Sequence, residues 1–176
     1  VKNINSGSSN SYPKRLTKLG STLIFFATDS SNGAELWKSD GTASGTSMIK
    51  DIVSGSGSSQ IYTKHNHVKV IGTTMYFTAG QWQDTDLWKT DGTSSGTTKV
   101  KDFISFSEYA DFVSIGSTLY FSATADSGAW GLWKSTGSSS GTTEITISSQ
   151  FEDPGNLVII NSKVYFSAYT SNNGRE

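Results

Sequence analysis

The sequence of 176 residues contains no cysteine, so neither a disulfide framework nor a cysteine-ligated zinc site can form. It also lacks an Asn-x-Ser/Thr sequon, which removes one sign of a secreted eukaryotic glycoprotein. No apolar run approaches the roughly 20 residues that span a bilayer. We therefore expect no membrane insertion.

An excess of charge of either sign is missing as well. The 14 basic residues are balanced by 15 acidic ones, giving a formal net charge of −1. Nucleic-acid binding requires a basic surface, so nucleic acid is not an expected partner. The sequence also has no nucleophile elbow, phosphate-binding loop or dinucleotide fingerprint. We expect neither a cofactor nor enzymatic activity, although carboxylates that are distant in the chain could still pair as in a glycoside hydrolase.

Glycine, serine and threonine are abundant instead, with 18 glycines and a hydrophobic share of 34%. These residues are poor or mediocre helix formers and are common in turns. This composition favours short strands joined by many turns, and hence an all-β fold.

The most informative feature is an internal repeat. The stretch ELWKSDGTASGT returns as DLWKTDGTSSGT and GLWKSTGSSSGT. Its tryptophans stand at positions 37, 88 and 133, so the intervals are 51 and 45 residues. Because the first interval carries an insertion, the period is about 45, within the range of propeller blades.

Each repeat reads as a four-stranded antiparallel meander. The turn between its first two strands holds Gly20, Gly72 or Gly116, and Asn161 in a fourth copy, all residues that tolerate positive φ. The second strands are apolar on both faces, which predicts that each sheet lies between two others. We therefore expect a β-propeller-like array of four-stranded blades, with units at 16–53, 67–104 and 112–148 and a split unit of 156–176 plus 1–5.

The split unit has a further implication. Residues 1–5 resemble the last strand of a repeat, whereas the C-terminal unit ends before its third strand. We expect the chain either to be cut from a longer array or to be completed by another chain, through β-augmentation.

The repeated motif residues are expected to be structural. The large, flat indole side chains of Trp37, Trp88 and Trp133 suit the space between neighbouring sheets. Ligand contact is the alternative. The loops built on Asp40–Gly41 and Asp91–Gly92 offer one carboxylate each. Calcium usually takes several, so a turn interpretation is favoured and no metal site is predicted.

The quoted motifs, followed by MIKDI and VKDF, resemble the bacterial ELWxxDGT repeat family. The third copy departs from it, since Gly131 replaces the acidic residue and Thr136 replaces the aspartate. The resemblance covers nearly the whole chain. It implies propeller-like β structure in long secreted or surface-attached proteins, and it implies no catalytic activity.

Two further groups of polar residues are weighed against their structural alternatives. Asp84 and Asp86 could meet a cation or a sugar hydroxyl, but Asp86 aligns with Glu35 and Glu176, which favours solvated edge charges. The segment His65-Asn66-His67 lacks the further ligands that zinc needs. We expect it to be an exposed connection between blades.

The turns between second and third strands offer the best candidate ligand site. They should emerge at one end of the array, where aromatic rings and a carboxylate suit sugar binding; the alternative is that the rings fold back over blade edges. The candidate ligand-binding residues are Trp82, Trp130, Tyr169 and Asp84.

The sequence thus predicts a non-enzymatic extracellular repeat module, acting as a spacer, an adhesin segment or a building block of a cell-surface or filamentous assembly. Its expected partners are other proteins, by self-association or through neighbouring repeats. The alternative is a carbohydrate-binding, lectin-type propeller with glycan partners.

Overall fold

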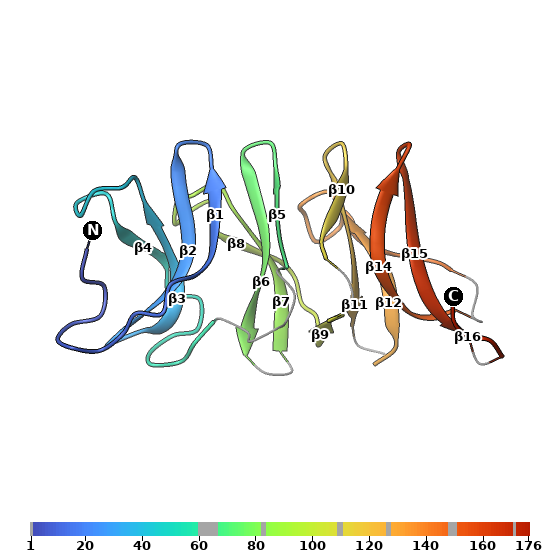
Figure 1. Cartoon of the computed structure of the whole chain (residues 1–176), viewed down its shortest axis with the longest axis horizontal. Helices are drawn as coiled ribbons and strands as arrows, with labels where there is room; N and C mark the ends of the chain where they lie inside the picture. Colours follow the sequence, from blue (N-terminus) through green and yellow to red (C-terminus); the bar gives the residue numbers. More distant parts are fainter. Residues whose placement is uncertain are drawn as a thin grey trace.

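The computed structural model describes residues 2–59, 67–81, 84–108, 111–125, 128–147, 151–170 and 172–176. Within these ranges the protein is all-β, with no helix long and apolar enough to cross a membrane. The strands form separate antiparallel sheets that lie side by side along the long axis, and the termini lie at opposite ends of the row (Figure 1). Among the described residues no strand pairing joins one sheet to another, and Figure 1 shows the sheets as an open row.

The first two sheets have four strands each, in sequence order. The first consists of β1 (Lys14–Leu19), β2 (Thr22–Asp29), β3 (Gly33–Ser39) and β4 (Ser47–Lys50). The second consists of β5 (Val68–Ile71), β6 (Thr74–Gln81), β7 (Asp84–Thr90) and β8 (Thr98–Lys101).

The last two sheets vary this plan. The third contains β10 (Val113–Ile115), β11 (Thr118–Thr124), β12 (Trp130–Ser135) and β13 (Thr142–Ile145), and the connecting strand β9 (Ser105–Phe106) also pairs with β11. The fourth contains β14 (Glu152–Ile160), β15 (Lys163–Thr170) and β16 (Gly174–Arg175). The added strand β9 was not anticipated from the repeat pattern.

The turn chemistry explains why the first two strands of each sheet pair in the same way. Gly20, Gly72 and Gly116 adopt φ values of 60°, 60° and 56°, and Asn161 adopts 49°. This left-handed backbone suits a two-residue hairpin turn, which fixes the register of the strands that follow. Each hairpin therefore points the same way in Figure 1.

The core lies between successive sheets. Alternate residues of a strand point to opposite faces, and the two faces of β6 accordingly join different clusters. Met75 and Phe77 pack with Ile24 and other residues of the first sheet. Tyr76 packs with residues of the third sheet, among them Phe121. The two faces of a sheet are thus distinct, one towards the preceding sheet and one towards the following sheet.

The outer face of the fourth sheet departs from the expectation that every sheet is covered on both sides. Tyr165, which aligns with the buried Tyr76, is 49% exposed. Its cross-strand partner Val158 is 48% exposed and Ile160 is 50% exposed. The identical strand pattern does not reveal this, because exposure depends on whether another sheet follows.

Residues 2–5 also lie elsewhere than predicted. Lys2 donates from Nζ to the carbonyl oxygen of Thr46 (2.9 Å), and Ile4 packs against the cluster of Phe25 and Trp37 on the first sheet. The described residues 2–5 therefore pack on the first sheet, whereas they were expected to join 156–176. The N-terminal segment instead covers part of the outer face of the first sheet.

Candidate functional site

The repeated Asp-Gly-Thr loops are hydrogen-bonded turns with nearly identical geometry. In the loop after β3, Oδ1 of Asp40 accepts from the backbone N–H (2.9 Å) and the hydroxyl (2.7 Å) of Thr42. In the loop after β7, Asp91 accepts the same two bonds from Thr93 at 2.8 and 2.7 Å. The glycine that follows each aspartate has a φ of 95° or 90°.

These bonds decide what the two carboxylates can do. The hydroxyl bond from Thr42, followed by its N–H bond, holds the pKa of Asp40 below its usual range, and Thr93 does the same for Asp91. A Cβ at Gly45 or Gly96 would overlap the respective carboxylate, so the loop closes tightly around it. Among the described residues no group of three or more His, Cys, Asp or Glu side chains could hold a metal ion.

The third loop keeps this shape without an aspartate. Thr136 stands in its place, while Ser138 Oγ accepts from the N–H of Gly141 at 3.0 Å. Thr42 and Thr93 accept the equivalent bonds from Gly45 and Gly96, both at 2.9 Å. One bond that all three loops share is therefore accepted by a hydroxyl oxygen, of a threonine in the first two loops and of a serine in the third.

The second and third loops dock onto the preceding sheet through their glycines. Lys38 donates from Nζ to the carbonyl oxygen of Gly92 (3.2 Å), and Lys89 donates to that of Gly137 (2.7 Å). Both glycines are buried, whereas Gly41 of the first loop is exposed. The loops and the motif lysines together form a repeated contact between sheets.

Two of the motif tryptophans lie in the core between sheets, whereas Trp37 lies on the outer face of the first sheet, in the cluster with Phe25 and Ile4. Trp37 is opposite Phe25 in the β2–β3 ladder and is 6% exposed. Trp133 is 8% exposed and meets Phe103 edge-on at 5.0 Å between ring centroids. Trp88 is half-buried against the cluster shared by the first two sheets.

The prediction that Asp84 and Asp86 are solvated edge charges is wrong for Asp86, and Glu35, the residue aligned with Asp86, is buried as well. Glu35 is completely buried, and its carboxyl accepts from the backbone N–H groups of Ile52 (2.8 Å), Val53 (3.3 Å) and Ser59 (3.1 Å). Burial raises the pKa of Glu35, against the opposing effect of these bonds. The side chain thus fastens the segment that leads to the next sheet.

Asp86 fastens the segment that leaves the second sheet, through one backbone N–H group and a lysine. It is 6% exposed, accepts from the N–H of Phe103 (3.3 Å) and pairs with Lys99 (3.0 Å). Burial raises the pKa of Asp86, while the bond to Lys99 opposes that shift. Its neighbour Asp84 is exposed at the start of β7, so the two carboxylates differ in role.

The prediction that the segment around His67 is exposed is also wrong for His67. His67 is 1% exposed, stacks on Phe112 with ring centroids 5.5 Å apart, and has Nε2 3.0 Å from the carbonyl oxygen of Ser107. His65 and Asn66 lie outside the described residues. His67 is therefore part of the packing between the second and third sheets.

Among the described residues, the candidate ligand residues do not converge on one hollow. Trp82 lies outside the described residues. Asp84 lines a hollow of about 260 Å³ beside Lys99. Trp130 is half-buried and lines another of about 550 Å³ with Glu144 and Glu152, and Tyr169 is exposed on the last sheet.

The larger hollow lies where the third repeat lacks its acidic residue. Gly131 takes the position of Glu35 and Asp86, and a Cβ there would overlap the carboxyl of Glu144 from β13. The repeat pattern singles out Gly131 as a departure, and Gly131 lines this hollow.

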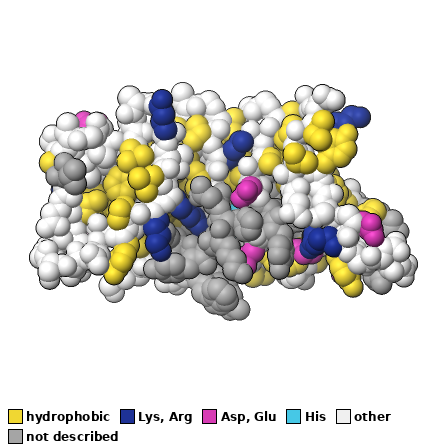
Figure 2. Space-filling model, in the orientation of Figure 1, with side chains coloured by type: hydrophobic (Ala, Val, Ile, Leu, Met, Phe, Trp, Pro, Cys, Tyr) yellow, Lys and Arg dark blue, Asp and Glu magenta, His cyan; other side chains and the backbone are white. Residues whose placement is uncertain are grey.

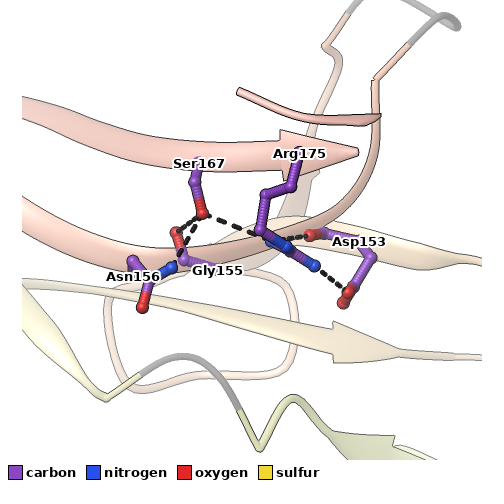
Figure 3. A network of polar contacts seen from close by, with 5 residues as sticks. All are labelled: Asp153, Gly155, Asn156, Ser167 and Arg175. Carbon is purple, nitrogen blue, oxygen red and sulfur yellow. Dashed lines mark hydrogen bonds and ion pairs between the residues drawn. The ribbon is translucent and has the colours of Figure 1, made fainter. Parts of the chain in front are cut away.

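The last sheet is closed by a polar network (Figure 3). Arg175 of β16 forms an ion pair with Asp153 and donates to the backbone oxygen of Asp153 (3.0 Å) and to Ser167 Oγ (3.2 Å). Asn156 donates to the same Ser167 oxygen (2.9 Å). These contacts join β16 to β14 across β15.

No family model and no curated protein matches the chain. Among solved structures it is similar to the putative TolB from Agrobacterium tumefaciens, with 13% identity, a TM-score of 0.51, and coverage of 96% of this chain and 58% of that one. TolB from Acinetobacter baumannii is a weaker match, with 12% identity, a TM-score of 0.44, and coverage of 88% and 39%.

The likeness to TolB, a β-propeller protein, confirms the propeller-like, all-β class of fold. The chain spans less than two thirds of the length of that structure. At this level of identity the likeness extends to the fold alone.

Proposed function

We propose that the protein is a non-enzymatic repeat module of the extracellular space or cell surface, and that it acts as a building block of a larger assembly. In this proposal the sheets are blades of about 45 residues arranged in an open array. The extracellular setting rests on the resemblance of the ELWKSDGT and DLWKTDGT motifs to the ELWxxDGT repeats.

The observation that carries the proposal is that the repeated residues are occupied in packing and turn contacts. Trp133 is buried between the second and third sheets, and Trp37 is buried beside Ile4 on the first sheet. Asp40 and Asp91 accept turn bonds, and Lys89 bonds to the next loop. Residues repeated for catalysis or ligand binding would instead gather around an accessible hollow. Repetition of packing contacts supports a role in which sheet follows sheet.

Electron microscopy of the purified chain, combined with sedimentation over a wide concentration range, tests this role. We expect particles longer than the single chain, with the same width, whose fraction rises with concentration. Antibody labelling of intact producing cells tests the location. A chain that stays monomeric at all concentrations and is labelled only after lysis would refute both parts.

The alternative function, carbohydrate binding, is favoured by one observation. Trp130 borders the hollow of about 550 Å³ together with Glu144 and Glu152, and an aromatic face beside carboxylates suits a sugar ring. A glycan array tests it with Trp130→Ala and, as a control in the exposed segment before the distant first sheet, Tyr12→Ala. Binding that is lost only in the first variant would replace the building-block proposal.

A further inference from the structure

The two internal contacts between loop and sheet follow one rule. In the first, a Cβ at Gly92 would lie 3.8 Å from side-chain atoms of Ile24 and Leu19 on the preceding sheet. In the second, a Cβ at Gly137 would overlap the hydroxyl of Tyr76. Since Ile24 and Tyr76 are aligned in the repeat, each following loop receives the same strand position of the sheet before it.

The first sheet presents the receiving half of this contact. Residues 2–5 cover part of it, while Leu16 and Gly41 remain exposed. We name the outer surface of this sheet the head face, defined by Leu16, Leu23, Phe25 and Gly41. These residues border a hollow of about 260 Å³. Gly41 has the same left-handed backbone as Gly92, at φ 95° and 90°, yet it is exposed.

Alignment along the first strand gives the same result. Leu16 corresponds to Val68 and Phe112 of the later repeats. Phe112 is buried against the preceding sheet and Val68 packs on the cluster of the first two sheets. Leu16 is 60% exposed. This part of the head face is therefore open to solvent, although the equivalent surfaces of the later repeats are packed against a preceding sheet.

The fourth sheet presents the inserting half. We name its outer surface the tail face, defined by Val158, Ile160, Tyr165 and Tyr169, all of which are exposed. Figure 2 shows hydrophobic side chains gathered over the β14–β15 hairpin. Tyr165 holds the strand position of Ile24 and Tyr76, which insert against the following loop inside the chain.

We infer that the tail face of one copy docks on the head face of a second copy, with Tyr165 seated against the loop at Gly41. The second copy is the occupant that the internal contacts define, because it offers the surface that Tyr76 already meets at Gly137. Unlike faces that meet in this way extend an assembly in one direction or close it into a ring. This inference rests on the proposed building-block function and specifies the surfaces that it uses.

The test uses one charged substitution on each face. Tyr165→Lys places an ammonium on the tail face and Leu16→Lys places one on the head face; both positions are exposed in the single chain, so folding should survive. We expect each variant to associate at least about tenfold more weakly than the wild type in sedimentation. Ser94→Lys adds the same charge on an exposed loop between β7 and β8 and serves as the control.

Mixing distinguishes unlike faces from like faces. The Tyr165→Lys chain keeps an unchanged head face and the Leu16→Lys chain keeps an unchanged tail face. An equimolar mixture should therefore form dimers that grow no further. A Leu16→Lys chain that still dimerises by itself would mean that two tails meet, and the inference would be wrong. A wild-type chain that remains monomeric overturns it together with the building-block proposal.

A third result separates the two proposals. If the wild type assembles and both variants assemble equally well, the building-block function stands, while the head-to-tail contact through Tyr165 is refuted. Thermal unfolding of each variant, compared with Ser94→Lys, verifies that lost association reflects the surface rather than the fold.

Discussion

At the residue scale, Glu35 gives the sharpest prediction. Its carboxyl satisfies three backbone N–H groups in the segment that leaves the first sheet. Replacing it with alanine removes the acceptor of the half-buried N–H groups of Ile52 and Val53, while the N–H of Ser59 keeps its bond to the carbonyl oxygen of Ala34 (3.0 Å). This should lower the free energy of unfolding by about 1–3 kcal/mol. Chemical denaturation measures this change.

The control for that experiment is Glu108→Ala. Glu108 is exposed, and surface substitutions usually change stability by no more than about 0.5 kcal/mol. Equal effects of the two variants would contradict the fastening role of Glu35.

The same residue predicts a pH dependence. Burial raises the pKa of Glu35, so the native state holds this proton more tightly than the unfolded state does. Relative to Glu35→Gln, the wild type should therefore lose stability as pH rises from about 4.3, the usual value for glutamate, through the raised native pKa. Asp86 titrates in both proteins, so its contribution cancels in the difference.

Denaturation curves at a series of pH values provide that difference. A wild type that instead gains stability over the glutamine variant as pH rises would show that the hydrogen bonds outweigh burial, and the assigned direction would be reversed.

Single residues also show where sequence reasoning fails. The turn at Asp40 is local, since its bonds reach only two residues along the chain. The sequence therefore predicted it. Glu35 meets partners 17 to 24 residues away and His67 meets Ser107, 40 residues away. A charged or imidazole side chain is usually exposed, so without those partners in view both were placed on the surface.

At the scale of the element, the loop glycines offer a matched pair. Gly41 and Gly137 have φ values of 95° and 92°, but a Cβ at Gly41 meets open space while one at Gly137 overlaps Tyr76. Gly41→Ala should cost about 1 kcal/mol, the strain of a left-handed alanine. Gly137→Ala should cost about 2–4 kcal/mol, because the contact between sheets must also shift.

Thermal or urea unfolding of the two variants measures the gap between them. Equal losses would mean that backbone strain alone keeps glycine in these loops, and that the Tyr76 contact contributes nothing.

Elements were the most predictable level of this fold. Period-two alternation and the hairpin residues at 20, 72, 116 and 161 located the second strands, and the structure places β2, β6, β11 and β15 there. The connecting strand β9 was missed because a strand of two residues is too short to show an alternation of apolar and polar residues. The prediction that the candidate ligand residues share one site was not met, since Asp84 and Trp130 line different hollows. Their relative positions depend on contacts between sheets, which the strand pattern does not specify.

At the scale of the whole molecule, stability should vary along the row of sheets. The second and third sheets lie between neighbours, and Phe77 and Phe121 are fully buried there. The fourth sheet has one open face with Tyr165 on it. In a stack where each sheet contacts only adjacent ones, the end units open first.

Hydrogen exchange measured by mass spectrometry tests this gradient. Amides of β6, β7, β11 and β12 should exchange more slowly than those of β14, β15 and β16. If association covers the tail face, protection of β15 should rise with protein concentration. Uniform protection along the chain would indicate that all four sheets open together.

The sequence could not reveal which end faces are open. Tyr76, Tyr120 and Tyr165 occupy the same strand position, but they are buried, half-buried and exposed in turn. Their surroundings differ only because a different surface follows each sheet. That information belongs to the packing of neighbours and is not written in the strand itself.

The unequal connections between sheets have a consequence for how such a chain can change. The motif tryptophans are 51 and 45 residues apart, yet Lys38 and Lys89 reach equivalent glycines of the next loop. Length differences are absorbed in the linkers without disturbing the register of the stack. An array with one repeat more or fewer would therefore keep the same contacts between its sheets.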